Sequence, residues 1–73
     1  MKGLVMKLTI NGEQRQFNES PPGNVGEVLA ILGLAGVPVV VEHNREALLP
    51  REHDAVALAD GDCLEIVRVV AGG

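Results

Sequence analysis

The end of the chain carries the group best suited to chemistry, a carboxylate with no side chain beside it. The sequence closes on Ala71-Gly72-Gly73, directly after the apolar run Ile66–Val70. Glycine has no Cβ, so a partner can enclose it closely, and its backbone adopts conformations closed to other residues. On its own such an end is more often merely frayed. The alternative is a flexible tail over residues 71–73 that inserts the Gly73 carboxylate into a narrow active site of another protein.

The other reactive side chains form no catalytic or metal-binding pattern. Cys63 is the single cysteine, and nothing in the sequence places a base beside it, so we expect a buried structural thiol. We expect His43 to be a partly buried structural residue and His53 to lie in a surface loop. No acid/base pair, nucleophile–base pair or Cys/His cluster at zinc spacing occurs. We therefore predict a protein that is not an enzyme and that binds no metal or cofactor by itself.

Length and composition limit the function further. A chain of 73 residues is one small domain, and its net charge is −4. The six Lys and Arg residues are scattered and Phe17 is the only aromatic residue, which argues against a nucleic-acid partner. No apolar run approaches the ~20 residues that span a bilayer, and Lys7 interrupts the apolar stretch that a secretory signal needs. A lone cysteine fits a reducing compartment, and we expect the cytoplasm.

Two segments joined by a tight turn predict a β-hairpin. Residues 6–10 alternate apolar and polar side chains, which predicts a strand whose apolar side chains face inward. Asn11-Gly12 follows, a strong hairpin signal because both residues tolerate a positive φ. Residues 13–17 then return as a second strand, with Phe17 in the core.

One helix is predicted after a polar, proline-containing loop at residues 18–23. Asn24 can cap this helix, and Glu27 stands three residues later, as in a capping box. Gly33 fits the position just beyond the helix end. The residues at helical spacing that give the helix its apolar face are Val25, Val28, Leu29 and Leu32.

The second half of the chain predicts mostly extended structure. Residues 37–43 are rich in β-branched side chains and predict a third strand, with Pro38 at its start. One helix for four or five strands predicts an α+β domain over residues 1–70, with the helix across one face and the first and last strands adjacent. The remaining expected elements are a turn (44–46), a brief extended piece (47–49), an irregular segment with one short helical turn (50–54), a weak strand or extended segment (55–59), a tight turn (60–62) and the last strand (63–70).

The last strand also predicts an exposed apolar patch. If its even-numbered side chains pack against the helix, Val67 and Val69 point outward beside Glu65. Val40 or Leu48 is expected near them. Scattered surface valines are normal, but exposed apolar patches often mark protein contacts. A chain of this length has few other surfaces, so Val67 and Val69 are the candidate partner contacts.

An ordered set of segments resembles the ThiS family, the sulfur carrier proteins of thiamine biosynthesis. The resemblance covers Met6 to Gly73, and the ordered set is more specific than any one piece. Residues 1–5 precede the usual start, so the native start is Met1 or Met6. His43 stands where the family usually has an aliphatic residue. The matching segments are residues 8–13, 25–29, 39–46, 49–51 and 58–67, together with Gly72-Gly73.

The resemblance implies a β-grasp (ubiquitin-like) fold with a mixed sheet of four to five strands. It also implies that a ThiF-like adenylyltransferase uses ATP to convert the Gly73 carboxylate to an acyl-adenylate. A sulfur donor fed by a cysteine desulfurase then forms a thiocarboxylate, from which a ThiG-like thiazole synthase takes the sulfur. Ala71 and Gly72 would be needed to pass through the partner's channel.

Three other functions stay open at this point. The first is a MoaD-like carrier, the small subunit of molybdopterin synthase, which has the same fold and terminus. The second is a carrier that delivers sulfur to another acceptor. The third is a β-grasp module that binds partners without covalent chemistry. The stretch 41–46, Val-Glu-His-Asn-Arg-Glu, and the segment Leu49-Pro50-Arg51 favour thiamine biosynthesis.

Overall fold

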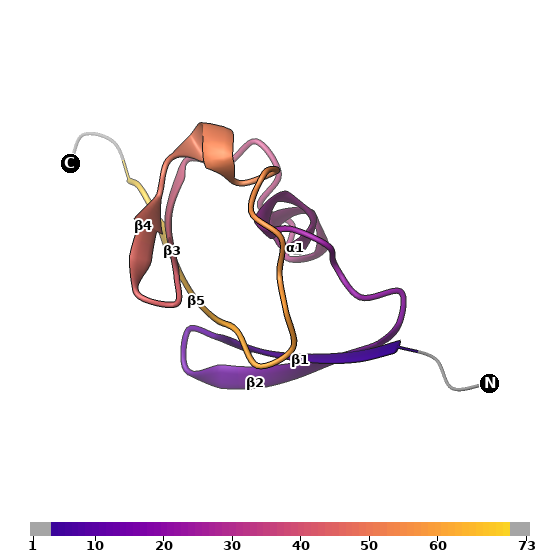
Figure 1. Ribbon diagram of the computed structural model, residues 1–73. Helices are drawn as coiled ribbons and strands as arrows, with labels where there is room; N and C mark the ends of the chain where they lie inside the picture. The colour runs from indigo at the N-terminus through magenta and orange to yellow at the C-terminus, as the bar shows by residue number, and fades with distance from the viewer. Residues whose placement is uncertain (1–3, 71–73) are drawn as a thin grey trace.

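The computed structural model describes residues 4–70 and is built on a five-stranded mixed sheet with the order β2-β1-β5-β3-β4. Helix α1 (Val25–Ile31) crosses one face of this sheet, and the 3-10 helix η1 (Pro50–Glu52) follows β4 (Figure 1). The predicted α+β architecture, with a helix across one face, is confirmed. The strands are β1 (Leu4–Ile10), β2 (Glu13–Glu19), β3 (Val39–His43), β4 (Glu46–Leu48) and β5 (Cys63–Arg68).

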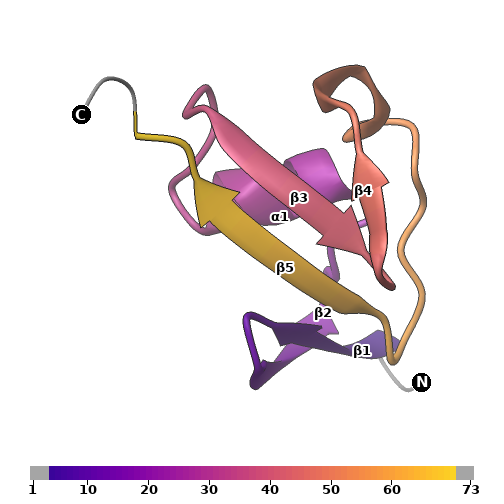
Figure 2. The ribbon, with the colours of Figure 1, turned by 90° about the vertical axis from the view of Figure 1, so that its left-hand side faces the viewer.

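Strand β5 is the middle strand of the sheet. It pairs parallel with β1, with Thr9 opposite Cys63, and antiparallel with β3 on its other side. Figure 2 shows β5 between these two neighbours. The prediction that the first and last strands are adjacent is therefore confirmed. β1 pairs with β5 only at Cys63 and Leu64, so the end of β5 that leads toward residues 71–73 is held in the sheet by its pairing with β3.

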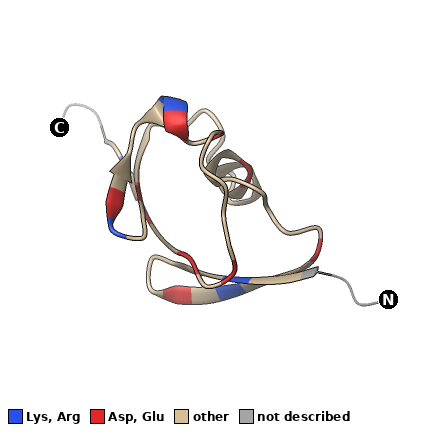
Figure 3. Ribbon diagram, in the orientation of Figure 1, with Lys and Arg blue, Asp and Glu red and all other residues tan. Residues whose placement is uncertain are grey.

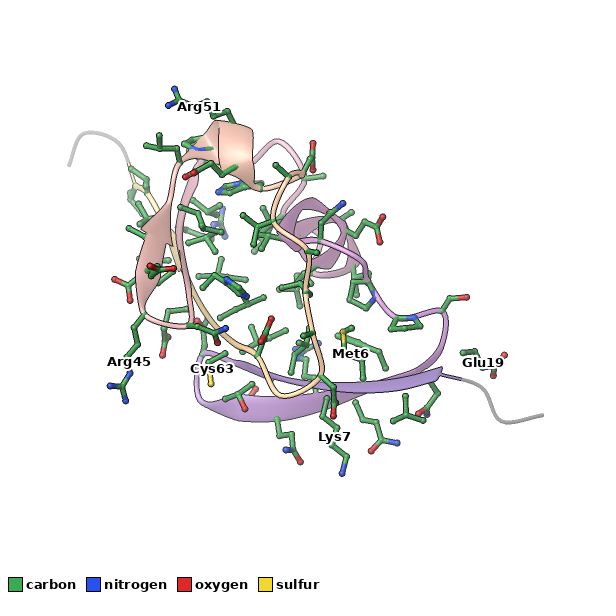
Figure 4. The ribbon with its side chains drawn as sticks, viewed as in Figure 1. Met6, Lys7, Glu19, Arg45, Arg51 and Cys63 are labelled. Carbon is green, nitrogen blue, oxygen red and sulfur yellow. The ribbon has the colours of Figure 1, made fainter. Side chains whose placement is uncertain are left out.

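The hairpin forms as its turn predicts. Asn11 and Gly12 have φ of 51° and 83°, as a two-residue turn with positive φ requires. Figure 4 shows the side chains of Met6 and Lys7 on opposite sides of β1, with Met6 toward the interior. The strands are longer than predicted, because pairing continues as far as Leu4 opposite Glu19.

The core lies between α1 and the sheet. The buried side chains of this core are aliphatic, and burying one of them contributes about 1.5–3 kcal/mol. A helix of only seven residues is marginal alone, so its packing on the sheet is the main source of its stability. Phe17, predicted in the core, is only partly buried against it. No helix in the described part of the chain has the length and hydropathy of a membrane span. The buried side chains are Leu8, Ile10, Val25, Val28, Leu29, Val41, Leu58, Leu64 and Ile66.

Both ends of α1 are capped as predicted. The Asn24 side chain accepts a hydrogen bond from the Glu27 N–H at 2.8 Å, and the Glu27 carboxylate accepts one from the Gly23 N–H at 2.7 Å. Gly33 has a φ of 77° just beyond the helix, and the Leu34 N–H donates to the Leu29 carbonyl at 2.7 Å. These bonds satisfy main-chain groups that a short helix otherwise leaves free.

The segment after η1 packs closely on the start of α1. The Gly26 N–H donates to the His53 carbonyl at 3.0 Å, and a Cβ at Gly26 would collide with the Asp54 carboxylate. This contact explains a glycine inside the helix. The predicted loop position of His53 is confirmed, but its predicted exposure is only partly correct, because His53 is half-buried and its Nε2 atom is buried. Residues 55–59 form no strand: the chain turns at Ala55 and bends at Val56, and Ala57 makes one isolated bridge to Asn24.

Candidate partner surface at the end of strand β5

The predicted reactive residue, Gly73, lies outside the described residues, as do Ala71 and Gly72. The surface that would meet a partner during a reaction at Gly73 is therefore defined by β5 and its neighbours. Side chains along β5 alternate between the two faces of the sheet. Leu64 and Ile66 are buried under α1, while the odd-numbered positions face outward on the side that α1 leaves open.

Cys63 is exposed, so the prediction of a buried thiol is wrong. Its odd position in β5 places the side chain on the open face, at the start of the strand and beside β1 (Figure 4). A cysteine in a strand takes the face that the register dictates, and here that face is the uncovered one.

Three apolar side chains form a row across the open face, at the end of the sheet where β5 finishes. Val67 lies directly opposite Val40 in the β3–β5 pairing. Leu49 follows β4 in an extended conformation. Because side chains alternate along extended backbone, Leu49 is on the same open face of the sheet as Ala47. The exposed fractions are 61% for Val67, 50% for Val40 and 48% for Leu49. We call Val67, Val40 and Leu49 the apolar row.

The apolar row clarifies which residues accompany Val67. Leu48, one of the two expected neighbours, pairs with the buried Val41 and faces the other side of the sheet. Val40, the other expected neighbour, lies directly opposite Val67. Leu49 was not identified from the sequence, although the alternation within residues 47–49 contains the signal.

Val69 lies in a different setting from Val67. Strand β5 ends at Arg68, and the Val69 N–H donates to the Pro38 carbonyl at 3.0 Å. Val69 is 52% exposed and borders an open groove of about 410 Å³. The other residues that line this groove are mostly apolar and include Leu29, Leu34, Val37, Pro50 and His53. Of the two candidate contacts, Val67 thus belongs to the apolar row and Val69 to this groove.

The Asn11 side chain fastens the hairpin turn to β5. Its Oδ1 accepts from the Ile66 N–H at 2.7 Å, and its Nδ2 donates to the Ile66 carbonyl at 3.1 Å. The Asn11 N–H also donates to the Leu64 carbonyl at 2.9 Å. A side-chain amide offers one donor and one acceptor side by side, as a peptide group does. Asn11 therefore extends the β1–β5 pairing beyond the end of β1.

Asp62 organises the turn that starts β5. Its carboxylate contacts His43 Nε2 at 2.8 Å, and it accepts from Asn44 Nδ2 at 3.1 Å and from the Ala59 N–H at 2.9 Å. Asn44 in turn accepts from the Cys63 N–H at 2.9 Å. Burial by itself raises the pKa of Asp62, but the hydrogen bonds from His43, Ala59 and Asn44 together hold the pKa below its usual 3.8. The prediction of a partly buried, structural His43 is confirmed by this contact.

Replacing Asp62 is expected to change how stability depends on pH. Because the pKa of Asp62 is lowered on folding, the unfolded chain takes up the proton first as pH falls. The stabilisation is complete above the unfolded pKa of about 3.9 and is lost as pH falls through the lower folded value. Asp62→Asn should lower the free energy of unfolding by about 1–2 kcal/mol at pH 7 and remove part of this acid dependence. Urea unfolding between neutral and acidic pH measures both effects.

Glu13→Gln is the matched control, because the Glu13 side chain is exposed and is not part of a hydrogen-bonded network like that of Asp62. An Asp62→Asn protein with the same acid dependence as the Glu13→Gln protein would contradict the assigned role of Asp62.

Three comparisons with known proteins bear on the identity of the chain. The model of the ThiS family matches residues 8–73. The chain belongs to the ThiS family. The crystal structure of thiamine biosynthesis protein ThiS from Geobacter metallireducens is similar to it, with 36% identity and a TM-score of 0.78. That match covers 93% of this chain and 100% of the other.

A longer protein contains a related region. A thiazole synthase from Paramagnetospirillum magneticum is 44% identical over 68 residues, which are 93% of this chain and 20% of that protein. The chain thus spans about a fifth of the length of this curated relative. Membership of the ThiS family confirms the resemblance to the sulfur carrier proteins of thiamine biosynthesis, a family of carriers and not of catalysts, and the structural match confirms the β-grasp fold.

Proposed function

We propose that this ThiS-family protein supplies the sulfur for the thiazole ring of thiamine and carries it on the carboxyl carbon of Gly73. A ThiF-like adenylyltransferase would join the Gly73 carboxylate to AMP from ATP and release pyrophosphate. Sulfide-level sulfur, which a thiol reductant releases from the persulfide of a donor fed by a cysteine desulfurase, would then displace AMP and leave a thiocarboxylate. The observation that carries this proposal is the family match, which extends through Gly73.

The chemistry explains why a carrier is activated before it accepts sulfur. A carboxylate is a poor electrophile because its negative charge repels nucleophiles. Adenylation neutralises that charge and supplies a good leaving group, so a sulfur nucleophile can form the new C–S bond as the bond to AMP breaks. The protein contributes a carbonyl carbon and a way to present it, while ATP stays with the activating enzyme.

The fold suits presentation of Gly73. β5 is paired with β3 as far as Arg68, and the chain leaves it at the end of the sheet that carries the apolar row. Residues 71–73, if extended, span about 10 Å at roughly 3.3–3.6 Å per residue. That length would let the domain dock on a partner's outer surface while the carboxyl carbon of Gly73 enters a narrow site.

The curated relative supports a thiazole synthase as the second partner. In that protein, which is named thiazole synthase, a region similar to this chain forms part of a longer polypeptide. Joining two proteins in one chain raises their effective concentration for each other. Such a fusion favours transfer between proteins that act in successive steps. We propose that this chain acts with a ThiG-like synthase in a reducing compartment, the cytoplasm.

The test is the mass of the intact protein. The purified chain is incubated with a ThiF-like enzyme, ATP and a sulfide source, and we expect the replacement of one oxygen by sulfur at Gly73. Adding a ThiG-like synthase with its other substrates should return the protein to its original mass as thiazole forms. If a control ThiS protein reacts under the same conditions and this chain does not, the proposal is wrong.

The apolar row is expected to contribute to docking. Val67→Asp should weaken binding to the adenylyltransferase by about tenfold or more, because it places a charge in an interface that loses water on binding. The free energy of unfolding should change little, since Val67 is mostly exposed. Isothermal titration calorimetry and urea unfolding measure the two quantities.

Val5→Asp is the matched control for Val67→Asp. Val5 is 51% exposed in β1, in the part of that strand that pairs with β2 alone and not with β5, so it lies away from the apolar row. If Val5→Asp weakens binding as much as Val67→Asp does, the effect comes from charge alone and the row is not a docking surface.

A further inference from the structure

Strand β2 is a long edge strand with one free side. The sheet order places β2 at one end, and β1 is its single neighbour among the described residues (Figure 1). Such an edge exposes a row of unpaired N–H and C=O groups, which natural proteins usually block with lysine, proline or a bulge. Residues 13–19 contain neither lysine nor proline, and their register with β1 has no bulge. The edge is therefore open to a further strand.

The bonds of β1 decide which main-chain groups of β2 are free. The Thr9 N–H donates to the Asp62 carbonyl at 3.0 Å, so the odd-numbered groups of β1 point toward β5. Directions alternate along a strand, so the even-numbered groups point toward β2, where Leu8 lies opposite Arg15. The odd-numbered groups of β2 thus point back to β1. The groups that point to the free edge belong to Gln14, Gln16 and Asn18.

A tight turn ends this free edge at Glu19. Glu19 has a φ of 68°, and the Ser20 N–H donates to the Asn18 carbonyl at 2.7 Å. A carbonyl oxygen has two lone pairs, so that of Asn18 can accept a second hydrogen bond from a partner strand. Figure 4 shows the Glu19 side chain at the far end of the hairpin, away from the interior. Pairing along the edge is therefore limited to residues 13–19.

The charges of β2 select one register for pairing with a second copy of the chain. A two-fold axis makes the two strands antiparallel, and their outward groups must face each other. The register centred on Gln16 sets Glu13 against Glu19 of the second copy, and the register centred on Arg15 sets two arginines together. Like charges directly opposite are destabilising. The register centred on Phe17 instead sets Arg15 against Glu19 twice, and the remaining registers pair fewer than five residues a side.

The register centred on Phe17 also satisfies side chains that the single chain leaves without partners. Within residues 4–70, neither Arg15 nor Glu19 has a salt bridge. Phe17 is only partly buried against its own core, and in this register it lies against Phe17 of the second copy. Opposite-charge and aromatic pairs across two strands both stabilise antiparallel pairing. Figure 3 shows the acidic and basic segments that follow each other along β2.

We propose that two copies of this chain associate through their β2 edges, in the register centred on Phe17, and form one continuous sheet. Main-chain hydrogen bonds join Gln16 of each copy to Asn18 of the other. The strand β1 separates β5 from this edge, so the apolar row and the segment that leads to Gly73 stay open in both copies. The dimer presents two reactive ends at once. The inference does not depend on the proposed function.

The size of the contact sets the expected affinity. Only residues 15–19 of each copy pair, which is less than the roughly 1,600 Å² of a standard interface requires. We therefore expect a weak dimer, with a dissociation constant of about 0.1–1 mM. Sedimentation velocity over a range of concentrations up to about 1 mM measures it.

The main test exchanges the two charges. Arg15→Glu should weaken the dimer about tenfold, because both contacts with Glu19 become repulsive. Arg15→Glu with Glu19→Arg restores opposite charges across the axis and should recover the wild-type dissociation constant to within about threefold. These positions lie about 13 Å apart along one strand, so recovery reports a contact between copies.

Arg15→Glu with Glu46→Arg is the matched control. It restores the net charge of −4 as the exchange does, but Glu46 is an exposed residue of β4, at the opposite edge of the sheet. We expect this protein to associate as weakly as Arg15→Glu alone. Urea unfolding should match the wild type in every variant, because the substituted side chains are exposed.

Hydrogen exchange of the wild-type chain tests the register without any substitution. As concentration rises, exchange should slow at the N–H groups of Gln16 and Asn18 and much less at Gln14, which lies outside the paired residues. Equal slowing at Gln14 would overturn the register. A chain that stays monomeric at about 1 mM would overturn the dimer, as would an exchanged-charge protein that associates no better than the Glu46 control. A failure of Gly73 to gain sulfur would overturn the proposed function and leave the dimer standing.

Discussion

Deletion of Gly73 is expected to lower the rate of thiocarboxylate formation by at least about 100-fold. The shortened chain still ends in a carboxylate, now on Gly72, so the loss does not come from removal of the functional group. It comes from reach, because one residue withdraws the carboxyl carbon by roughly 3.3–3.6 Å. Reacting atoms must approach to about 3–3.5 Å, and a displacement of that size leaves them apart. Intact mass after incubation with the activating enzyme, ATP and sulfide measures the rate.

Two further variants separate reach from shape. Adding one alanine after Gly73 also displaces the carboxylate and should be equally inactive. Gly73→Ala keeps the length but adds a methyl group beside the reacting carbon, and we expect a smaller loss. Circular dichroism and urea unfolding should match the wild type in all three proteins. A Gly73 deletion that still gains sulfur at the wild-type rate would contradict the assignment of Gly73 as the carrying residue.

Local patterns predicted most of the elements on which this reactive end depends. The Asn11-Gly12 turn, the Asn24 cap and the stop at Gly33 each follow from interactions between residues close in sequence, and all three form as expected. Alternation also assigned Leu64 and Ile66 to the buried face. The ends of strands were less predictable. β1 begins at Leu4 because its partner β2 continues to Glu19, and pairing across the hairpin is not visible in either segment alone.

Features that depend on register between distant segments could not be predicted. The apolar row needs the β3–β5 and β4–β3 registers, so the sequence suggested Leu48 or Val40 where the structure has Val40 and Leu49. The exposed position of Cys63 depends on which face α1 covers. His53 is half-buried because the segment after η1 packs on Gly26, a contact between residues far apart in the chain.

Asn11→Ala is expected to destabilise the domain by about 2–5 kcal/mol. The substitution leaves the N–H and the carbonyl of Ile66 without the partners that now lie at 2.7 and 3.1 Å, and lost hydrogen bonds of this kind cost about 1–3 kcal/mol. It also forces alanine to keep a φ of 51°, which costs roughly 1–2 kcal/mol. Urea unfolding measures the change in the free energy of unfolding.

Two other substitutions at Asn11 divide this cost into its parts. Asn11→Gly accepts the positive φ but lacks the amide, so its loss of stability should be smaller than that of alanine and should report mainly the two bonds to Ile66. Asn11→Asp keeps one acceptor for the Ile66 N–H but turns a second oxygen toward the Ile66 carbonyl, where a donor is needed. If glycine at this position is as stable as asparagine, the amide contributes nothing and only backbone conformation matters. If glycine and aspartate both lose stability, the hairpin turn is what holds β5 in place near the end that leads to Gly73.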